Sequence, residues 1–504
     1  MRELTTFTQA RPSFVAPVVD PEPLRKFRKY TRVDLPSSVT AGKEDNFIDA
    51  GLMLGRSFRV GWGSDGRIAH LGSLYNAPKP TQSDTLTIDK LKILPNSTVR
   101  SFWALAVFKH SRRFSQPLDT TQTIATLALQ LSHTPIYTSP GSSIPFAVTH
   151  PELRFSHFVS PLSPLDRSSE AHLFRLGHAL FDEIDDLAAP EDATRELVDR
   201  ITEIRRRELL EKWLEDVVRG DVEEDLRDAA AAGSDGAKRV FVLLSGHQVE
   251  RACDAAVEGK DLRLATLVAQ AGGDDDFRED VFLQLAKWRE YRVDAHIGNE
   301  YRRVYELLCG NVGRSEGIAK GDKVDGADEL HVAEGLDWKR AFGLHLWYGT
   351  FQASLASVVD RYEDATTDQE VANPLPAYLE KPETAPAYST TWSSSPDAPV
   401  DPLFQLIKIF TDPAHPLELA LLPRNFGPSP IDYRLPWHLY ILFSRVLRTR
   451  DFEDRVEVGE VEEGVEGNSP RADMVTESYA TQLELQGLWQ WAVFVLLHLE
   501  LPEK

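Results

Sequence analysis

The stretch Ser168-Ser-Glu-Ala-His-Leu-Phe-Arg-Leu-Gly-His-Ala-Leu-Phe-Asp-Glu-Ile184 marks the change from strand-like to helical patterning in this chain of 504 residues. Apolar residues recur in it every three or four positions, as on one face of a helix, at Leu173, Leu176, Leu180 and Ile184. The spacing continues on later turns, at Leu197, Ile201, Ile204, Leu209 and Leu214. Helical patterns then follow one another with short connections and no constant repeat period. The sequence therefore predicts a mainly α fold, either an irregular α-solenoid or a large helical bundle.

Further helical stripes extend towards the C-terminus. They include the sets Phe277, Val281, Leu285, Trp288 and Tyr301, Val304, Tyr305, Leu308. A third set is apolar on most of the helix surface, which predicts deep burial of Leu439, Ile441, Leu442, Val446 and Leu447. Four polar stretches interrupt the helices and are predicted as surface loops, at 230–236, 313–333, 374–402 and 456–471. The first two bracket residues 237–312, which we expect to form a helical lobe of their own.

Residues before 160 have a different pattern. Residues 1–44 are rich in Pro and charge and predict an extended arm, which contains the basic run Arg25 to Arg32. Residues 45–160 contain short apolar runs separated by turn residues, typical of strands, at 46–54, 57–62, 67–74, 85–94 and 99–108. A few strands with no covering helix are marginal alone and expose pairing edges. This small sheet is therefore expected to need a partner.

Gly61, Gly63 and Gly66 match the pattern G-x-G-x-x-G of dinucleotide-binding loops. A phosphate site requires this pattern to leave a strand and open a helix, where backbone N–H groups meet the pyrophosphate. Here Ser64-Asp65-Gly66 is a turn signal between two alternating runs, 58–62 and 67–71, which predicts a β-hairpin. A helical enzyme or nucleotide-binding protein that uses Gly61–Gly66 stays as the alternative of another class.

The charge balance argues against a nucleic-acid ligand. The chain has 56 Lys and Arg against 78 Asp and Glu, a formal net charge of −22, which repels polyphosphate backbones. The basic run 25–32 is the exception; it is expected to be a solvated arm, with an acidic partner or nucleic acid as the alternative. Cys253 and Cys309 have no metal or disulfide spacing, and no apolar run is long enough to span a membrane.

Candidate chemical sites are weak throughout. His178 with Asp182, Asp185 and Asp186 has helical metal-ligand spacing, but a second histidine is missing. Asp274 to Asp276 lack the alternating ligands of a calcium loop and fit the acidic start of a helix. The remaining histidines are expected to pack in the core or in loops, at His150, His157 and His345. The sequence predicts no catalytic residue, no metal site and no cofactor.

Three stretches carry a family resemblance, in the same order across about 450 residues. They are Phe47-Ile-Asp-Ala-Gly-Leu-Met-Leu-Gly-Arg-Ser-Phe-Arg-Val-Gly-Trp62, Leu336-Asp-Trp-Lys-Arg-Ala-Phe-Gly-Leu-His-Leu-Trp-Tyr-Gly349 and Tyr479-Ala-Thr-Gln-Leu-Glu-Leu-Gln-Gly-Leu-Trp-Gln-Trp-Ala-Val-Phe-Val-Leu-Leu497. They resemble a scaffold nucleoporin family of the Y-shaped complex in the nuclear pore, the C-terminal product of a self-cleaving FG-nucleoporin precursor. The resemblance covers nearly everything from about Leu24 onwards.

The resemblance implies the ancestral coatomer element, a U-shaped α-solenoid with trunk arms at 165–232 and 336–504 and a crown at 237–312. The segment 45–160 would insert as a blade into an open six-bladed β-propeller shared with the COPII coat. Residues of that blade would be Phe47, Ile48, Leu52, Phe58, Val60, Trp62, Ile68 and Leu71. The crown would pair with another helical nucleoporin, through the candidates Phe241, Leu244, Val249, Leu264 and Leu267.

The function implied is structural: a scaffold subunit in the coat of the nuclear pore complex at the nuclear envelope, on which mRNA and protein transport depend indirectly. A COPII-like vesicle coat subunit is the alternative within the same class. The resemblance also implies that the chain is truncated, since family members continue with helices that join other subunits of the Y complex. On the same resemblance, we expect this sequence to lack the family's autoproteolytic domain, and therefore its cleavage chemistry.

Overall fold

The structure is a computed structural model that describes residues 60–63, 67–71, 86–90, 120–138, 144–184, 194–233, 236–317, 326–349, 353–380, 399–427, 429, 431–455 and 468–500. These residues fall into two compact units, a small sheet and a helical unit. The described part is mainly helical, as the periodicity predicts. No helix within it is long and apolar enough to cross a membrane.

The small sheet is a three-stranded antiparallel meander in the order β1 (Val60–Gly63), β2 (Arg67–Leu71) and β3 (Leu86–Lys90). Trp62 pairs with Ile68 across the first turn, and Ala69 pairs with Ile88 across the second interface. The predicted hairpin is confirmed. The predicted strands at 46–54 and 99–108 lie outside the described residues.

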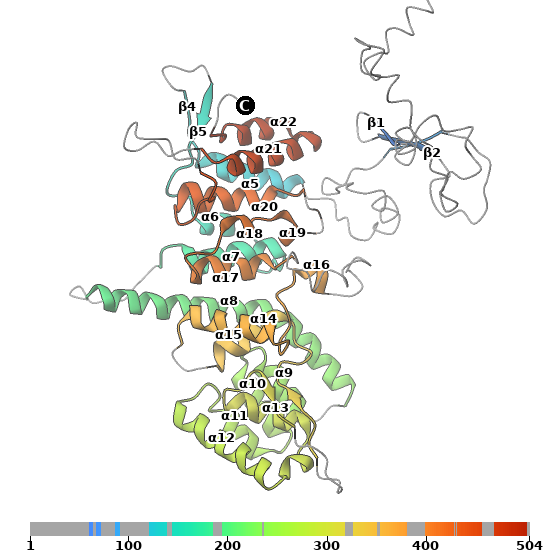
Figure 1. The fold of residues 1–504 in the computed structure, drawn as a ribbon, viewed down its shortest axis with the longest axis vertical. Coiled ribbons are helices and arrows are strands. Elements are labelled where there is room, and N and C mark those ends of the chain that lie inside the picture. Colours follow the sequence, from blue (N-terminus) through green and yellow to red (C-terminus); the bar gives the residue numbers. More distant parts are fainter. Residues whose placement is uncertain are drawn as a thin grey trace, which may run out of the picture. The chain divides into compact units, whose positions relative to one another are not determined.

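The helical unit begins with α5 (Thr120–Ser132), a short hairpin of β4 (Ile136–Thr138) and β5 (Pro145–Ala147), and α6 (Phe155–Val159). α7 (Ser169–Phe181) and α8 (Arg195–Ala231) follow. The hydroxyl of Ser168 caps α7 by accepting from the N–H of Ala171, and the hydroxyl of Thr194 caps α8 by accepting from the N–H of Leu197. In Figure 1, α8 crosses the stack of helices near its middle and continues beyond it on one side.

The chain then forms a lobe and reverses. The lobe contains α9 (Gly236–Leu244), α10 (Val249–Glu258), α11 (Leu262–Val268), α12 (Asp275–Glu290), the 3₁₀ turn η4 (Val293–His296) and α13 (Asn299–Leu308). The expected helical segment 237–312 begins within α9 and ends four residues after α13. After the short pair β6 (Arg314–Ser315) and β7 (Leu330–His331), α14 (Trp338–Trp347) returns to pack on α8.

After this reversal, the later helices pack on the earlier ones in reverse order of sequence. α15 (Leu355–Thr367), α16 (Ala377–Glu380) and α17 (Pro402–Thr411) come first, and α17 packs on α7. The last layers contain α18 (Leu417–Ala420), α19 (Pro423–Phe426), α20 (Arg434–Tyr440), the π-helical turn η6 (Ile441–Val446), α21 (Pro470–Leu485) and α22 (Trp489–Leu496). α22 lies against α5, so the first and last helices of this unit share one layer (Figure 1).

Two expectations about local structure are wrong. Residues 120–132 and 155–159 form helices, although they lie in the predicted β segment 45–160. The run from Thr120 is rich in β-branched residues, but Thr123, Leu127 and Gln130 are buried at helical spacing, so tertiary packing overrides their strand propensity. Leu197 and Ile204, predicted on a buried face, are exposed in the first half of α8, which contacts few neighbours.

Most predicted stripes do form the core. Leu173, Leu176 and Leu180 are buried in α7, whereas Ile184 lies beyond the end of that helix. The predicted deep burial at 439–447 is confirmed for Leu439, Ile441, Leu442 and Val446. A hydrogen bond also links α5 to α20. Nδ1–H of the buried His438 donates to Oε1 of Gln130 at 2.5 Å.

Candidate functional site

The predicted blade residues divide between the sheet and the undescribed chain. Val60 and Trp62 lie in β1, and Ile68 and Leu71 lie in β2. β2 is the central strand and pairs with both neighbours, so β1 and β3 are the outer strands of the described meander. Residues 47, 48, 52 and 58 lie outside the described residues. The sheet therefore presents two strands that can pair with further strands.

The same sheet overturns the nucleotide-site alternative. Gly61 and Gly63 belong to β1, and Gly63 pairs with Arg67 at the start of β2. The glycine pattern therefore ends in an antiparallel hairpin and does not open a helix. Without a helix N-terminus, the geometry that binds a pyrophosphate is missing from this segment.

The predicted crown residues lie mainly inside the lobe. Phe241, Leu244 and Leu264 are buried, and Val249 and Leu267 are partly buried. The guanidinium of Arg303 covers the ring of Phe241 at 3.9 Å, and the hydroxyl of Tyr348 donates to the backbone oxygen of Leu244 at 3.0 Å. The two helices α9 and α11 thus direct these side chains into the chain's own core.

Other apolar residues of the lobe are exposed. They are Val257 at the end of α10, Leu262 at the start of α11, Phe282 and Leu283 in α12, and Tyr291 just after it. Leu262 and Phe282 are 67% and 55% exposed. Sequence periodicity predicts the buried stripe of α12. It gives no sign of the exposed apolar residues of this helix, because one buried stripe is enough to explain why the helix packs against the core. These exposed residues are the better candidates for a contact surface of the lobe.

A cavity of about 380 Å³ lies between the end of α8, α9 and α10, and both charged and apolar side chains line it. Its charged side chains form pairs: Arg239 with Glu258 at 3.1 Å, and Arg251 with Glu223 at 2.5 Å. Arg227, also in the wall, donates to the backbone oxygen of Glu223. Three acidic and three basic side chains line the cavity, so it offers no excess of either charge to a small ionic ligand.

α14, which lies within the second resembling stretch, is buried at every residue. Its charged side chains are paired accordingly. Nζ of Lys339 contacts Oε1 of Glu380 at 2.9 Å, and Arg340 contacts Asp225 and Asp337 at 2.5 and 2.6 Å. Nε1–H of Trp338 donates to Oδ2 of Asp401 at 3.3 Å. This stretch therefore joins α8, α16 and α17 to one another through the centre of the unit.

Asp401 is the most perturbed carboxyl group of this network. It caps α17, where its Oδ1 accepts from the N–H of Leu403 at 2.8 Å, and it is 2% exposed. Burial raises the pKa of Asp401 from 3.8 to about 7, although Lys339 opposes the shift. Between these values the folded protein holds a proton that the unfolded chain has released, so stability falls as pH rises from about 4 to 7.

Asp401→Asn is expected to remove this pH dependence. Relative to the variant, the wild type should lose about 2–3 kcal/mol of unfolding free energy between pH 5 and 8, because the raised pKa favours the protonated form. The loss is complete once the pH exceeds about 7. Urea denaturation of both proteins across this range measures the difference. A difference that is constant with pH would contradict the shifted pKa, whatever effect the lost Trp338 hydrogen bond has on absolute stability.

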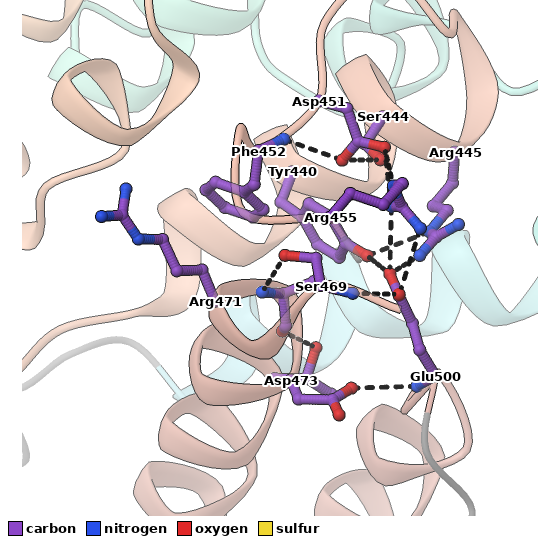
Figure 2. Close-up of polar contacts among 12 residues, drawn as sticks. Tyr440, Ser444, Arg445, Asp451, Phe452, Arg455, Ser469, Arg471, Asp473 and Glu500 are labelled. Atoms are coloured by element: carbon purple, nitrogen blue, oxygen red, sulfur yellow. Dashed lines mark hydrogen bonds and ion pairs between the residues drawn. The ribbon is translucent and has the colours of Figure 1, made fainter. Parts of the chain in front are cut away.

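A second polar network surrounds Glu500, directly after the third resembling stretch (Figure 2). Its carboxylate accepts from the hydroxyl of Tyr440 at 2.9 Å and from the N–H of Ser469 at 2.7 Å, and it pairs with Arg455 at 3.2 Å and with Arg445. The backbone N–H of Glu500 donates to Asp473 at 2.9 Å. Glu500, which follows α22, thus links the end of α20, η6, the segment after η6 and the start of α21.

Ser469 extends this network to the helix start. Its hydroxyl donates to Asp454 at 2.6 Å and accepts from the N–H of Ala472 at 3.1 Å, which caps α21. The sequence gives no sign of the contacts of Glu500 and Ser469 with Tyr440, Asp454 and each other, since these residues lie far apart in the chain.

The weak metal candidates have structural roles. Nδ1 of His178 contacts Asp182 at 2.9 Å, and the same carboxylate accepts from the N–H groups of Phe155 and Ser156 at 3.0 and 2.7 Å. Asp274 caps α12 through the N–H of Phe277, as its position before a helix predicts. Among the described residues, no group of three or more His, Cys, Asp or Glu side chains is placed to hold a metal ion.

His345 is a core residue, as expected. It is 8% exposed, and burial lowers its pKa to about 4, so it is neutral at physiological pH. His157 packs edge-on against His133 with ring centroids 4.6 Å apart, and His150 is exposed beside Glu152.

Comparison with known proteins identifies similar sequences. The family model described as nuclear protein 96 matches residues 238–504. Nucleoporin nup189 of Schizosaccharomyces pombe is 30% identical over 348 residues, which is 69% of this chain and 18% of that protein. Nuclear pore complex protein Nup98-Nup96 of Drosophila melanogaster is 26% identical over 93% of this chain and 22% of its own length. Nuclear pore complex protein NUP96 of Arabidopsis thaliana is 26% identical over 91% and 43%. The chain thus spans less than half the length of each.

Proposed function

Because the chain belongs to the nuclear protein 96 family, we propose that it is a structural subunit of the nuclear pore complex at the nuclear envelope. The names of the three relatives describe nucleoporins or nuclear pore complex proteins, which favours the pore over a vesicle coat and over an enzyme. Its role is that of a scaffold: a rigid helical unit that positions neighbouring subunits through exposed surfaces.

The observation that carries the scaffold proposal is the separate three-stranded sheet. β1, β2 and β3 form an antiparallel meander in a unit of their own. Propeller blades are small antiparallel sheets, usually of four strands. We propose that this sheet completes an open six-bladed propeller in trans, with backbone hydrogen bonds at an outer strand supplying affinity.

The lobe at 237–312 is proposed to be the crown that pairs with another helical nucleoporin. The exposed residues Leu262, Phe282, Leu283 and Tyr291 support this role better than the buried ones, since large apolar side chains in water are typical of contact surfaces. The buried residues Phe241, Leu244 and Leu264 would then support that surface from inside the lobe.

Ile68→Pro in the central strand is expected to abolish propeller binding, with at least a hundredfold loss in affinity. Proline removes a backbone donor and cannot occupy a strand that pairs on both sides. The test is light scattering after size-exclusion chromatography of the whole chain, co-expressed with the six-bladed propeller that the nuclear pore shares with the COPII coat. A one-to-one complex is expected for the wild type only.

Leu197→Asp serves as the matched control, because Leu197 is exposed on the first half of α8 in the other unit. It should bind the propeller like the wild type, and both variants should keep the helical circular dichroism of the wild type. Blade insertion would be refuted if the Ile68→Pro variant still formed the complex, or if the wild type formed no complex with the propeller. Neither result would affect the membership of the chain in the family.

A further inference from the structure

The loop between α6 and α7 contains an exposed serine with a proline directly after it. Ser163 and Pro164 are both exposed. The N–H of Asp166 donates to the carbonyl oxygen of Ser163 at 2.9 Å, which closes a turn with Pro164 in its second position. The N–H of Leu165 donates to the hydroxyl oxygen of Ser163 at 3.3 Å. The loop is therefore a defined turn that presents the Ser163 side chain at the surface.

Two arginines belong to the surroundings of this turn. Nη2 of Arg175, in α7, donates to the carbonyl oxygen of Ser163 at 2.8 Å, and its Nη1 donates to that of Asp166 at 2.6 Å. Arg167, directly after the turn, donates through Nη1 to the carbonyl oxygen of Asp216 at 3.2 Å. Within the described part of the chain, both guanidinium groups thus contact carbonyl oxygens and no carboxylate.

The positive charge of the two arginines acts on a neighbouring histidine. The pKa of His172 in α7 is lowered to about 4, first by burial and then by Arg175, Arg167 and Lys339. Asp166 acts in the opposite direction but is outweighed. The start of α7 is therefore locally positive, although the formal net charge of the chain is −22. An anionic group added at this place would be stabilised.

Ser163 differs from the other serines that precede a proline. These are Ser139, Ser160, Ser395, Ser429 and Ser469. Ser139 and Ser395 lie outside the described residues, whereas Ser429 and Ser469 are 3% and 0% exposed. Ser160 is exposed, but no hydrogen bond within the described residues joins it to an arginine. Ser163 also has a second proline, Pro161, two positions before it, which the other five lack.

We infer that Ser163 is a phosphorylation site for a proline-directed serine kinase, and that its phosphate pairs with Arg175 and Arg167 and fixes the loop on α7. The pattern Pro-x-Ser-Pro is the sequence that the mitogen-activated class of these kinases recognises. Proline has no N–H, so it suits an enzyme pocket that offers no acceptor after the serine. The inference does not depend on the proposed contacts of the blade or the lobe.

The reaction is a phosphoryl transfer from ATP. The hydroxyl oxygen of Ser163 forms a bond to the γ-phosphorus, and the bond from that phosphorus to the oxygen bridging it to the β-phosphorus breaks. The hydroxyl proton passes to a base of the kinase, and ADP leaves. The phosphoserine carries a charge of about −1.5 to −2 at pH 7 and three acceptor oxygens. Guanidinium groups bind phosphate through strong, often bidentate hydrogen bonds, so Arg175 and Arg167 gain the anionic partner that they lack among the described residues.

The test incubates the whole chain with a recombinant mitogen-activated protein kinase and ATP. Mass spectrometry should locate phosphate on Ser163, and its ³¹P NMR signal is the one missing from Ser163→Ala. Because nearby cations stabilise the dianion, this signal should titrate at least about 0.5 pH units below phosphoserine in an unstructured peptide, whose second pKa is about 6. Arg175→Gln with Arg167→Gln should remove the difference.

Three further variants complete the experiment. Arg167→Gln alone should remove part of the difference and should fold, because Arg167 is exposed. Arg195→Gln, which changes an exposed arginine in the first turn of α8, is the matched control and should titrate like the wild type. Ser160→Ala should still accept phosphate on Ser163. A chain that takes up no phosphate on Ser163 would overturn the site. A phosphate that titrates identically with and without the two arginines would overturn the pairing.

Discussion

Trp338→Ala is expected to lower the free energy of unfolding of the helical unit by about 4 kcal/mol, the largest effect predicted for a single residue here. The side chain is 1% exposed and packs edge-on against Phe404, with ring centroids 5.8 Å apart. Its removal leaves a cavity where α14 meets α17. It also removes the indole donor from the buried carboxyl of Asp401. Urea denaturation followed by circular dichroism measures the change.

Trp338→Phe separates the two contributions. The phenyl ring retains most of the packing but donates no hydrogen bond, so we expect a loss of about 1–2 kcal/mol. A variant at Trp489, which is exposed, should change stability by no more than about 0.5 kcal/mol. Equal losses for Trp338→Ala and Trp338→Phe would show that the hydrogen bond matters and the packing does not.

Glu500→Ala is the second large prediction, with an expected loss of about 3 kcal/mol. Removing one partner of a buried ion pair costs about 3–5 kcal/mol, because the remaining charge stays buried. The Glu500 side chain is 10% exposed, whereas Arg445 and Arg455 are 26% and 19% exposed. Both arginines can therefore recover some hydration, which places the loss at the lower end. The measurement is again denaturation by urea.

Two variants test whether the charge or the shape of Glu500 matters. Glu500→Gln keeps an acceptor for the hydroxyl of Tyr440 but loses the charge, so its loss should be about half that of alanine. Glu477→Gln changes an exposed glutamate of α21 and should be nearly neutral. If Glu500→Ala and Glu477→Gln denature at the same urea concentration, the network does not stabilise the last layers.

Local signals explain what could be predicted. The bounds expected for the helical segment 237–312 depend on Gly- and Ala-rich or polar stretches that interrupt the helical period on both sides of it. The hairpin at 60–71 followed from a turn signal between alternating runs, and the helix start at Asp274 to Asp276 followed from acidic residues placed before an apolar stripe. Each of these depends on residues only a few positions apart.

Long-range packing explains what was missed. The helix α5 has residues that favour strands, yet it is held by α6 and α22, and its Gln130 contacts His438 across 308 positions of sequence. The crown candidates Phe241, Leu244 and Leu264 failed as surface residues for a similar reason. Periodicity identifies an apolar face of a helix but does not say whether that face packs against the same chain or lies in water. These three residues pack inside the chain, whereas Phe282 is exposed.

The amino-acid sequence by itself determined the mainly helical class, the β-hairpin at the glycine-rich segment and the family, because helical period, turn residues and motifs are properties of neighbouring positions. Only the tertiary structure decided which apolar faces stay in water, how Asp401 acquires a pKa of about 7, and which four segments converge on Glu500. These features depend on burial and on charges brought together from distant parts of the chain. The free energies of burial and charge pairing are set by three-dimensional surroundings, which no local pattern contains.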